Sequence, residues 1–432
     1  MKTAHQFIFL TGIIIGWSMM TLPSVHAQAP RWELVYYPNG PVITPGFQAP
    51  WDTNGVEDPE LLWDGMEFRL YYTAIDALGV QRIAAATSRN LLEWTPRGII
   101  LEPRAGTFDR DGVSDPDVLR VGSQYILFYT ATNYEWRQIA RVDSPDGYHF
   151  TGNRDVVLTG SFNGNRFDYL GAGEPSVIYS GGMYQLVYRG FDSNVWWRLG
   201  LALSEDGFHF LSISSSLERQ AIFGRGPHGY DDGGAGEPEI WSGNANDIRM
   251  LYTSLHYCLD GPLYRIGYTS DGYFNWDRYN MISGIGEPGD WNGMHFKSPS
   301  VLDFGDFLLV AMEGWPNRLQ ASGIGLMIGV ERWLKSKQNH LVFHTTGGIV
   351  PPGRIELGNY GASDVVITGI TVIGPSFTIV PPSLPHVLKP SDERVLSVSY
   401  TPDPGGTPVQ GRVIIESNAQ IGNTITIHLS GY

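Results

Sequence analysis

Cysteine is almost absent from this sequence. Cys258 is the only one in 432 residues, so the chain can form no disulfide within itself. No set of cysteine and histidine residues has the spacing of a structural zinc site. We expect Cys258 to be a small buried residue, with a reactive thiol as the less favoured alternative.

Positive charge is also scarce. Lysine and arginine number 29 against 44 aspartates and glutamates, which gives a net charge of −15. Binding to nucleic acid or to an anionic membrane surface requires a basic footprint. The composition therefore argues against both kinds of partner. With 42% hydrophobic residues, the chain still has ample material for packed cores.

Long apolar runs occur only at the N-terminus. Lys2 precedes an apolar stretch from Phe7 to Met20, and small residues at a cleavage site end at Ala27. This pattern predicts a signal peptide over residues 1–27 and a secreted protein, extracellular or periplasmic. No later run reaches the roughly 18 residues of a membrane span, so we expect no membrane-spanning segment. Helical periodicity of useful length is absent too.

An internal repeat dominates the rest of the chain. Each copy has an aromatic residue, an aspartate, five further residues, an acid and a proline, and the copies recur about every 60 residues. The copies are Trp51-Asp52 to Asp58-Pro59, Phe108-Asp109 to Asp115-Pro116, Phe167-Asp168 to Glu174-Pro175, Tyr230-Asp231 to Glu237-Pro238 and the degenerate Trp291-Asn292 to Ser298-Pro299.

Four of the copies open a block of four short strands, and three of these blocks contain an Asp-Gly turn. This arrangement is typical of a propeller blade. We therefore predict an all-β protein with a five-bladed β-propeller over residues 32–335. The fifth block lacks its fourth strand, and residues 32–43 resemble the fourth strand of the first block. We expect this N-terminal segment to complete the last blade and so remove an exposed sheet edge.

The pattern changes after about Lys337. Residues 339–432 contain seven or so short strands, which predicts an immunoglobulin-like β-sandwich. Several short motifs of this segment resemble the ASPM/SPD-2/Hydin module. They are Gly353, Leu357-Gly358-Asn359-Tyr360-Gly361, Pro381-Pro382, Tyr400-Thr401-Pro402 and Leu429-Ser430-Gly431. That resemblance implies an accessory domain that packs or binds, for example by docking to a cell surface or a glycan.

The first strand of each blade lines the central channel of a propeller. Four carboxylates are therefore expected at the axis, and a second acidic layer lies two residues further along on the same face. The first layer is Asp58, Asp115, Glu174 and Glu237; the second is Glu60, Asp117 and Glu239, with Ser176 and Ser300 in the other two blades.

Two interpretations of these axial acids remain open. An acid before proline can accept hydrogen bonds in the entry turn, which is a structural role. Crowded carboxylates in a narrow channel also raise one another's pKa, which suits acid–base chemistry on an acetal. We expect no required cofactor, although a structural Ca²⁺ at the axis would relieve the repulsion. For the set Asp52, Asp109, Asp168 and Asp231 the structural role is favoured.

Departures from the repeat are more specific clues. The fifth block has His295 where the others have glycine, and Ser298 where they have an acid. Second strands end in threonine in three blocks, but in Arg189 and Glu313 in the other two. Arg189 either steadies a carboxylate, binds a sugar hydroxyl or forms a surface salt bridge. His295 is either a ligand to an axial cation, water or substrate, or a turn histidine.

Residues 32–335 resemble the five-bladed propeller glycosidases, above all the arabinanase/β-xylosidase family 43. Gly55-Val56-Glu57-Asp58-Pro59 and the Ser-x-Asp-Gly turns also resemble the mannoside phosphorylases of family 130. The family 43 resemblance implies Asp58 as the base, Glu237 as the acid, and Glu174 or Asp115 as the residue that tunes the acid. It also implies inversion at the sugar carbon.

The leading hypothesis is a secreted glycoside hydrolase whose partner is a carbohydrate substrate. Arg189, His295, Glu313, Trp51 and Trp291 are its candidate substrate-binding residues. Most tryptophans in propellers pack between blades, so only some of the candidates are expected to stack on sugar faces. The alternatives are a non-catalytic propeller that binds glycans or cell-wall material, and a mannoside phosphorylase or hydrolase.

Overall fold

The computed structural model describes residues 34–432 with short gaps. The gaps are residues 135, 194–195, 214–217, 227–230, 245–246, 259–260, 271–276, 280–289, 305–306, 318–319, 331–333, 345–349, 360–363, 390–391, 404, 406 and 420–421. The predicted signal peptide and Tyr230 lie outside the described residues, as does the side chain of Cys258. In the described part, η1 (Glu218–Gln220) is the one helical element, and no helix is long and apolar enough to cross a membrane.

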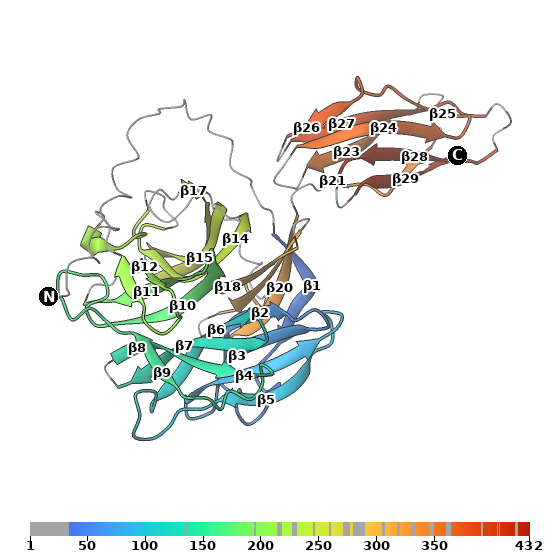
Figure 1. Cartoon of the computed structure of the whole chain (residues 1–432). Coiled ribbons are helices and arrows are strands. Elements are labelled where there is room, and N and C mark those ends of the chain that lie inside the picture. Colours follow the sequence, from blue (N-terminus) through green and yellow to red (C-terminus); the bar gives the residue numbers. More distant parts are fainter. Residues whose placement is uncertain are drawn as a thin grey trace, which may run out of the picture. The chain divides into compact units, whose positions relative to one another are not determined.

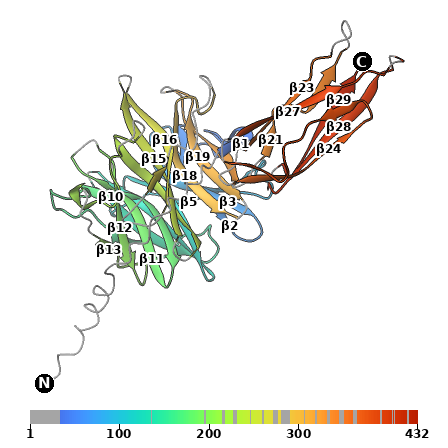
Figure 2. The same ribbon diagram turned by 90° about the horizontal axis from the view of Figure 1, so that it is seen from above.

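Four groups of four antiparallel strands follow one another along the chain (Figure 1). A single parallel pair, Gly171 with Arg137, joins the second group to the third. The first has β2 (Gly55–Trp63), β3 (Phe68–Ile75), β4 (Gln81–Ser88) and β5 (Thr95–Leu101). The second has β6 (Gly112–Val121), β7 (Gln124–Asn133), β8 (Trp136–Ser144) and β9 (Asp155–Leu158). The third has β10 (Gly171–Ser180), β11 (Met183–Phe191), β12 (Arg198–Ser204) and β13 (Leu211–Ile213), side by side in Figure 2. The fourth has β14 (Gly234–Asn244), β15 (Asp247–Cys258), β16 (Gly261–Ser270) and β17 (Asp277–Tyr279).

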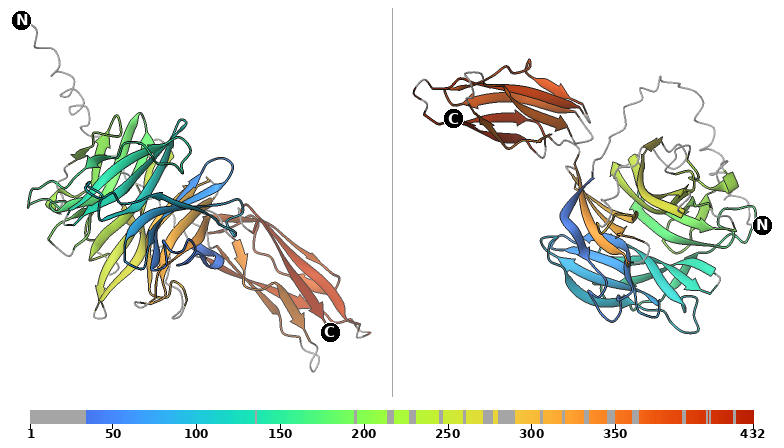
Figure 3. Two further views of the ribbon diagram at one scale, coloured as in Figure 1. Left: turned by 90° about the horizontal axis from the view of Figure 1, so that it is seen from below. Right: turned by 180° about the vertical axis from the view of Figure 1, so that it is seen from behind.

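A fifth unit takes its last strand from the N-terminal end of the described chain. It contains β18 (His295–Asp303), β19 (Phe307–Trp315), β20 (Gly323–Val330) and β1 (Leu34–Ile43). Blue β1 runs antiparallel beside orange β20 in the right-hand view of Figure 3. This is the pairing expected from the sequence, and it leaves β20 with a partner on both sides.

The first strands of the five units form a closed cycle. β2 contacts β6, β6 contacts β10, β10 contacts β14, β14 contacts β18, and β18 contacts β2. One hydrogen bond repeats at every junction: the residue two places after the acid accepts the backbone N–H of the next unit. The donor–acceptor pairs are Val118–Glu60 (3.5 Å), Val177–Asp117 (2.8 Å), Ile240–Ser176 (2.9 Å), Val301–Glu239 (2.8 Å) and Leu61–Ser300 (2.9 Å).

Three of the four recurrent aspartates of the repeat have the structural role expected of them. Asp52, Asp109 and Asp168 are buried, and each accepts a hydrogen bond from a tyrosine hydroxyl of its own second strand. The donors are Tyr72 (3.2 Å), Tyr129 (3.1 Å) and Tyr188 (2.9 Å). Buried carboxylates need such partners, so these bonds anchor the entry loop of each unit to its sheet.

Large rings at the aromatic position of the repeat fill space over glycines. The ring of Trp291 lies against Gly314 of β19 and Gly325 of β20, where any Cβ would overlap it. The ring of Phe167 covers Gly190 and Gly200 in the same way. The aromatic ring and the glycines therefore pack together within a unit, because the ring occupies the space that a larger side chain would need.

Replacing Gly325 by alanine should destabilise the fifth unit. The added methyl group overlaps the Trp291 ring, and overpacking of this kind costs about 1–3 kcal/mol. Urea unfolding followed by tryptophan fluorescence measures the loss. Gly325→Ala combined with Trp291→Phe should recover part of it; equal stability of Gly325→Ala and the unchanged protein would contradict this packing.

The C-terminal segment forms two sheets around one core. One sheet contains β21 (Leu334–Ser336), β23 (Gly353–Asn359), β27 (Glu393–Tyr400) and β25 (Phe377–Ile379). The other contains β22 (His340–Phe343), β29 (Thr424–Gly431), β28 (Val409–Ser417), β24 (Val365–Ile373) and β26 (His386–Leu388). Phe343, Val398 and Ile415 are buried in the shared core. Because β21 pairs with β23, this two-sheet unit includes residues that precede 339.

Candidate active site

A strained backbone directs the acids of the repeat. Every residue before the repeat proline has a positive φ: 48° at Asp58, 50° at Asp115, 51° at Glu174, 45° at Glu237 and 50° at Ser298. The register between first and second strands shifts at the same place in all five units. A left-handed non-glycine residue costs about 1–2 kcal/mol. Such bulges re-aim side chains and are frequent beside active sites.

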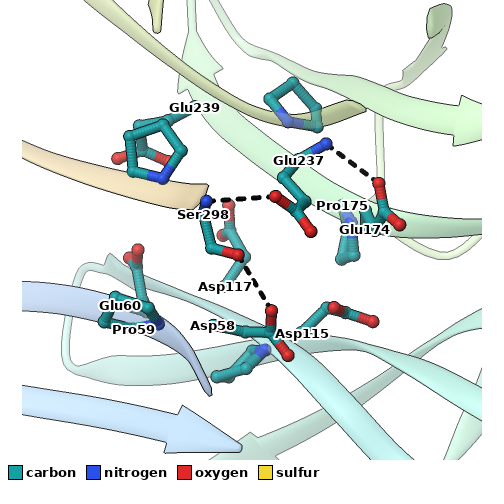
Figure 4. Close-up of a pocket in the computed structure, with 13 residues that line it drawn as sticks. Asp58, Pro59, Glu60, Asp115, Asp117, Glu174, Pro175, Glu237, Glu239 and Ser298 are labelled. Carbon is teal, nitrogen blue, oxygen red and sulfur yellow. Dashed lines mark hydrogen bonds between the residues drawn. The ribbon is translucent and has the colours of Figure 1, made fainter. Parts of the chain in front are cut away.

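Acid–proline segments of four units and Ser298-Pro299 of the fifth line one axial pocket of about 350 Å³, counted out to the solvent at its mouth (Figure 4). The four acids predicted for the first layer are together here, half-buried or buried. The lining residues are Asp58, Pro59, Glu60, Asp115, Pro116, Asp117, Glu174, Pro175, Glu237, Pro238, Glu239, Ser298 and Pro299.

Ser298 connects the two acids predicted to do the chemistry. Its hydroxyl donates to Asp58 Oδ1 at 3.0 Å, and its backbone N–H donates to Glu237 Oε2 at 3.1 Å. In Figure 4 both carboxyl groups point into the space that Ser298 borders. The serine hydroxyl makes the bond to Asp58 and the backbone of the same residue makes the bond to Glu237, so residue 298 links the two acids.

Arg189 and Glu313, which replace threonine at the end of the second strand, change which group accepts the backbone N–H of the next unit. The hydroxyls of Thr73, Thr130 and Thr253 accept the N–H groups of Asp115, Glu174 and Ser298 in the next unit, at 2.8–3.1 Å. Where threonine is replaced, a carboxylate accepts instead. The N–H of Glu237 donates to Glu174 Oε2 at 2.9 Å, and that of Asp58 approaches Glu313 Oε2 at 3.5 Å.

Arg189 steadies a carboxylate, which is one of the alternatives left open for it. Its Nη1 donates to Glu174 Oε1 at 2.7 Å. Its guanidinium lies 3.9 Å from the centre of the Trp197 ring, a cation–π contact. Trp197 in turn stacks on Tyr264, with ring centres 5.3 Å apart.

Lys297 is a site residue that the sequence interpretation missed. It directly precedes Ser298, and its Nζ lies 3.3 Å from Glu313 Oε1 and 3.6 Å from Glu237 Oε1. The repeat contained a signal for it. At this position the other units have Glu57, Ser114, Gly173 and Gly236, so a lysine is the single cation of the set.

Asp58 and Glu237 differ in electrostatic environment. Burial raises the pKa of Asp58 well above its ordinary value, and the neighbouring Asp115, Glu313 and Glu57 add to the effect. Burial also acts on Glu237, but Lys297, a hydrogen bond from Thr253 and Arg189 outweigh it and lower the pKa of Glu237. Asp58 therefore holds a proton to higher pH than Glu237 does.

Burial raises the pKa of the surrounding acids as well. The pKa of Glu313 rises to about 8 despite Lys297, and those of Glu57 and Glu174 rise in the same direction. Protons shared among these acids, together with Lys297 and Arg189, limit the negative charge of the pocket.

Calcium does not fit the carboxylates at this end of the axis. Glu57, Asp58 and Glu313 have oxygens within 4.8 Å of one another. However, Glu313 accepts a hydrogen bond from Trp315 Nε1 and contacts the Lys297 ammonium, and Asp58 accepts from Ser298. Ca²⁺ needs six to eight oxygen ligands, and an ammonium group beside one of them repels it.

None of the five predicted substrate-binding residues is among those that line the pocket. His295 is buried against Tyr264, with ring centres 4.9 Å apart, outside the carboxylate cluster. Trp291 packs inside the fifth unit over its two glycines. Trp51 is 38% exposed, with the Arg82 guanidinium 4.9 Å from its ring centre. Arg189 and Glu313, by contrast, contact the pocket acids or their neighbours directly.

No protein-family model matches this sequence, and no curated protein is detectably similar to it. Solved structures are similar over roughly seven tenths of the chain. One comes from work on the GH130 family of mannoside phosphorylases, which contains glycoside hydrolases that target β-1,2-mannosidic linkages in Candida mannan. It is 16% identical with a TM-score of 0.53, over 71% of this chain and 95% of that one.

Two further structures are similar to the same extent. A thermostable family-43 glycoside hydrolase is 15% identical with a TM-score of 0.51, over 68% of this chain and 92% of that one. The β-1,2-mannobiose phosphorylase from Listeria innocua is 13% identical with a TM-score of 0.53, over 68% and 96%. What is shared is the fold. Chemistry has to be argued from the residues of the pocket.

Proposed function

We propose that this chain is a secreted glycoside hydrolase with a five-bladed propeller, cleaving an oligo- or polysaccharide at the axial pocket. One observation carries the proposal: two carboxyl groups with opposite pKa shifts, Asp58 and Glu237, line one pocket and are joined through Ser298. Pairs of titratable groups pushed apart in this way mark an acid and a base.

The electrostatics favour the reverse of the roles that the resemblance to family 43 implies. Asp58, whose pKa is raised, is the general acid, and Glu237, whose pKa is lowered, is the general base. Glu237 takes a proton from water, and the water oxygen bonds to the anomeric carbon. The bond from that carbon to the leaving oxygen breaks, and this oxygen takes the proton of Asp58. The sugar carbon inverts, as in enzymes whose carboxyls stand about 6.5–9.5 Å apart.

Phosphorolysis is the second candidate, because structures from family 130 share the fold. A phosphate ion would need cations that are available to it. Arg189 and Lys297, which flank the pocket, are each already paired with glutamates. Hydrolysis is therefore favoured.

A panel of aryl pentosides and hexosides, with and without inorganic phosphate, tests the proposal. We expect release of the aryl alcohol from at least one glycoside without phosphate, and proton NMR of the first product should show the inverted anomer. Phosphate-dependent turnover would identify a phosphorylase. Glycan binding without any turnover would identify the non-catalytic binding propeller and exclude the enzyme.

Two further assignments belong to this proposal. Cleavage after Ala27 would deliver the mature chain outside the cytoplasm, and N-terminal sequencing of the exported protein tests it. The C-terminal two-sheet domain is proposed to be immunoglobulin-like and to dock the enzyme to a cell surface or glycan. Its own core supports an independent accessory role.

A further inference from the structure

Lys297 is held at the pocket by strand register. It lies directly opposite Glu313 in the antiparallel pair of β18 and β19. Cross-strand partners face the same side of a sheet, so the ammonium group meets the Glu313 carboxylate at 3.3 Å. The same ammonium lies 3.6 Å from Glu237, which belongs to the neighbouring unit. One side chain thus joins carboxylates of two units.

Aromatic rings shield this lysine from solvent. Its Nζ is 5.9 Å from the ring centres of both Tyr264 and Trp315, and only 16% of its side chain is exposed. Trp315 also donates a hydrogen bond to Glu313, the same carboxylate that Lys297 contacts. A buried ammonium is stable only with such paired carboxylates, and removal of one partner leaves the other uncompensated.

The ammonium group of Lys297 brings a positive charge among the axial acids. The carboxylates beside it do not fit Ca²⁺, as described above, whereas each of them contacts or faces the lysine. We infer that Lys297 is the built-in counter-ion of the pocket and a positioning residue that holds the Glu237 carboxylate ready to accept a proton. The inference rests on the proposed function only where it takes Glu237 to be the general base.

Charged groups face Glu237 from several elements. Lys297 of β18 and Arg189 of β11 favour its ionised form. Three acids oppose it: Glu174 of β10, Glu313 of β19 and Glu57 of β2. Tyr264 of β16 lies nearby. Without the Lys297 charge the acids prevail, so the pKa of Glu237 should rise.

The test compares Lys297→Met with Lys297→Arg. In Lys297→Met we expect the acidic limb of the pH profile of kcat/KM to move up by about one pH unit or more. Lys297→Arg, which keeps the charge, should stay near the original profile. Lys337→Met is a matched control, since Lys337 also pairs with two glutamates, Glu356 and Glu393, on the C-terminal domain. A folded Lys297→Met protein with an unmoved limb would overturn the inference.

Two measurements remain decisive without turnover. Carbon-13 NMR of glutamate-labelled protein, with Glu237 assigned through Glu237→Gln, should show the same upward pKa shift in Lys297→Met. Calorimetry of the unmodified protein with CaCl₂ should show no binding at the pocket; tight Ca²⁺ binding abolished by Asp58→Asn would overturn the inference even if no lysine variant folds. Absence of glycosidase activity would contradict the proposed function, but the NMR titration and the calorimetry would still test the role of Lys297.

Discussion

Asp58→Asn and Glu237→Gln should lose kcat/KM to different extents on natural and activated substrates. A protonated Asp58 is needed only where the leaving oxygen must be protonated. Asp58→Asn should therefore lose about 10²–10⁴-fold in kcat/KM on natural oligosaccharides and far less on activated aryl glycosides. Glu237→Gln removes the group that activates water, so it should lose a similar factor on both substrate classes.

Steady-state kinetics on one activated and one unactivated glycoside of the same sugar separates the two roles. Glu393→Gln, an exposed glutamate of the C-terminal domain, is the control and should change neither value. The opposite pattern, with Glu237→Gln spared on the activated glycoside, would restore the roles that the family 43 resemblance implies. Equal losses in both variants on both substrates would contradict any division into acid and base.

The acid–proline repeat was enough to predict which carboxyl groups meet at the axis. Constant spacing from Asp52 to Asp58 and from Asp231 to Glu237 requires equivalent positions in equivalent units, and side-chain alternation places Glu60 on the same face. The N-terminal strand was predictable for a similar reason, since a unit of three strands leaves an edge that 32–43 matches.

Charges contributed across unit boundaries were not predictable. The roles of Asp58 and Glu237 depend on where Lys297, Glu313 and Arg189 place their charged atoms, and these contacts join different units. Comparison of the repeats aligns positions within a unit but does not give the geometry between neighbours. The packing of Trp291 was not predictable for a related reason: its glycine partners, at positions 314 and 325, do not belong to the repeat phrase.

The residues of the second acidic layer stabilise the fold and have no part in the proposed reaction. Glu60, Asp117 and Glu239 alternate with Ser176 and Ser300 as acceptors for the backbone of the next unit. A serine and a carboxyl group perform this task equally, so the acids are not required as anions. Burial raises the pKa of Asp117 to about 7 and that of Glu239 to about 8.

These raised pKa values predict that the ring loses stability as pH rises. Between about pH 4 and 7 the folded chain keeps the Asp117 proton while the unfolded chain releases it, so the folded state binds more protons and stability falls with pH. Glu239 extends the loss to about pH 8. Asp117→Asn cannot ionise and keeps an oxygen for the Val177 N–H. Relative to the unmodified protein it should gain about 1–4 kcal/mol at pH 8 and little at pH 4.

Urea midpoints at both pH values, followed by tryptophan fluorescence, measure this difference. Asp64→Asn is the control of opposite sign, because hydrogen bonds and Arg69 lower the pKa of Asp64 in spite of some burial. That variant should be less stable than the unmodified protein at pH 8 and approach it as pH falls below about 4. If Asp117→Asn instead loses stability at pH 8, the carboxylate is needed as an anion. The contacts between the first strands of neighbouring units then depend on charge as well as on hydrogen bonding.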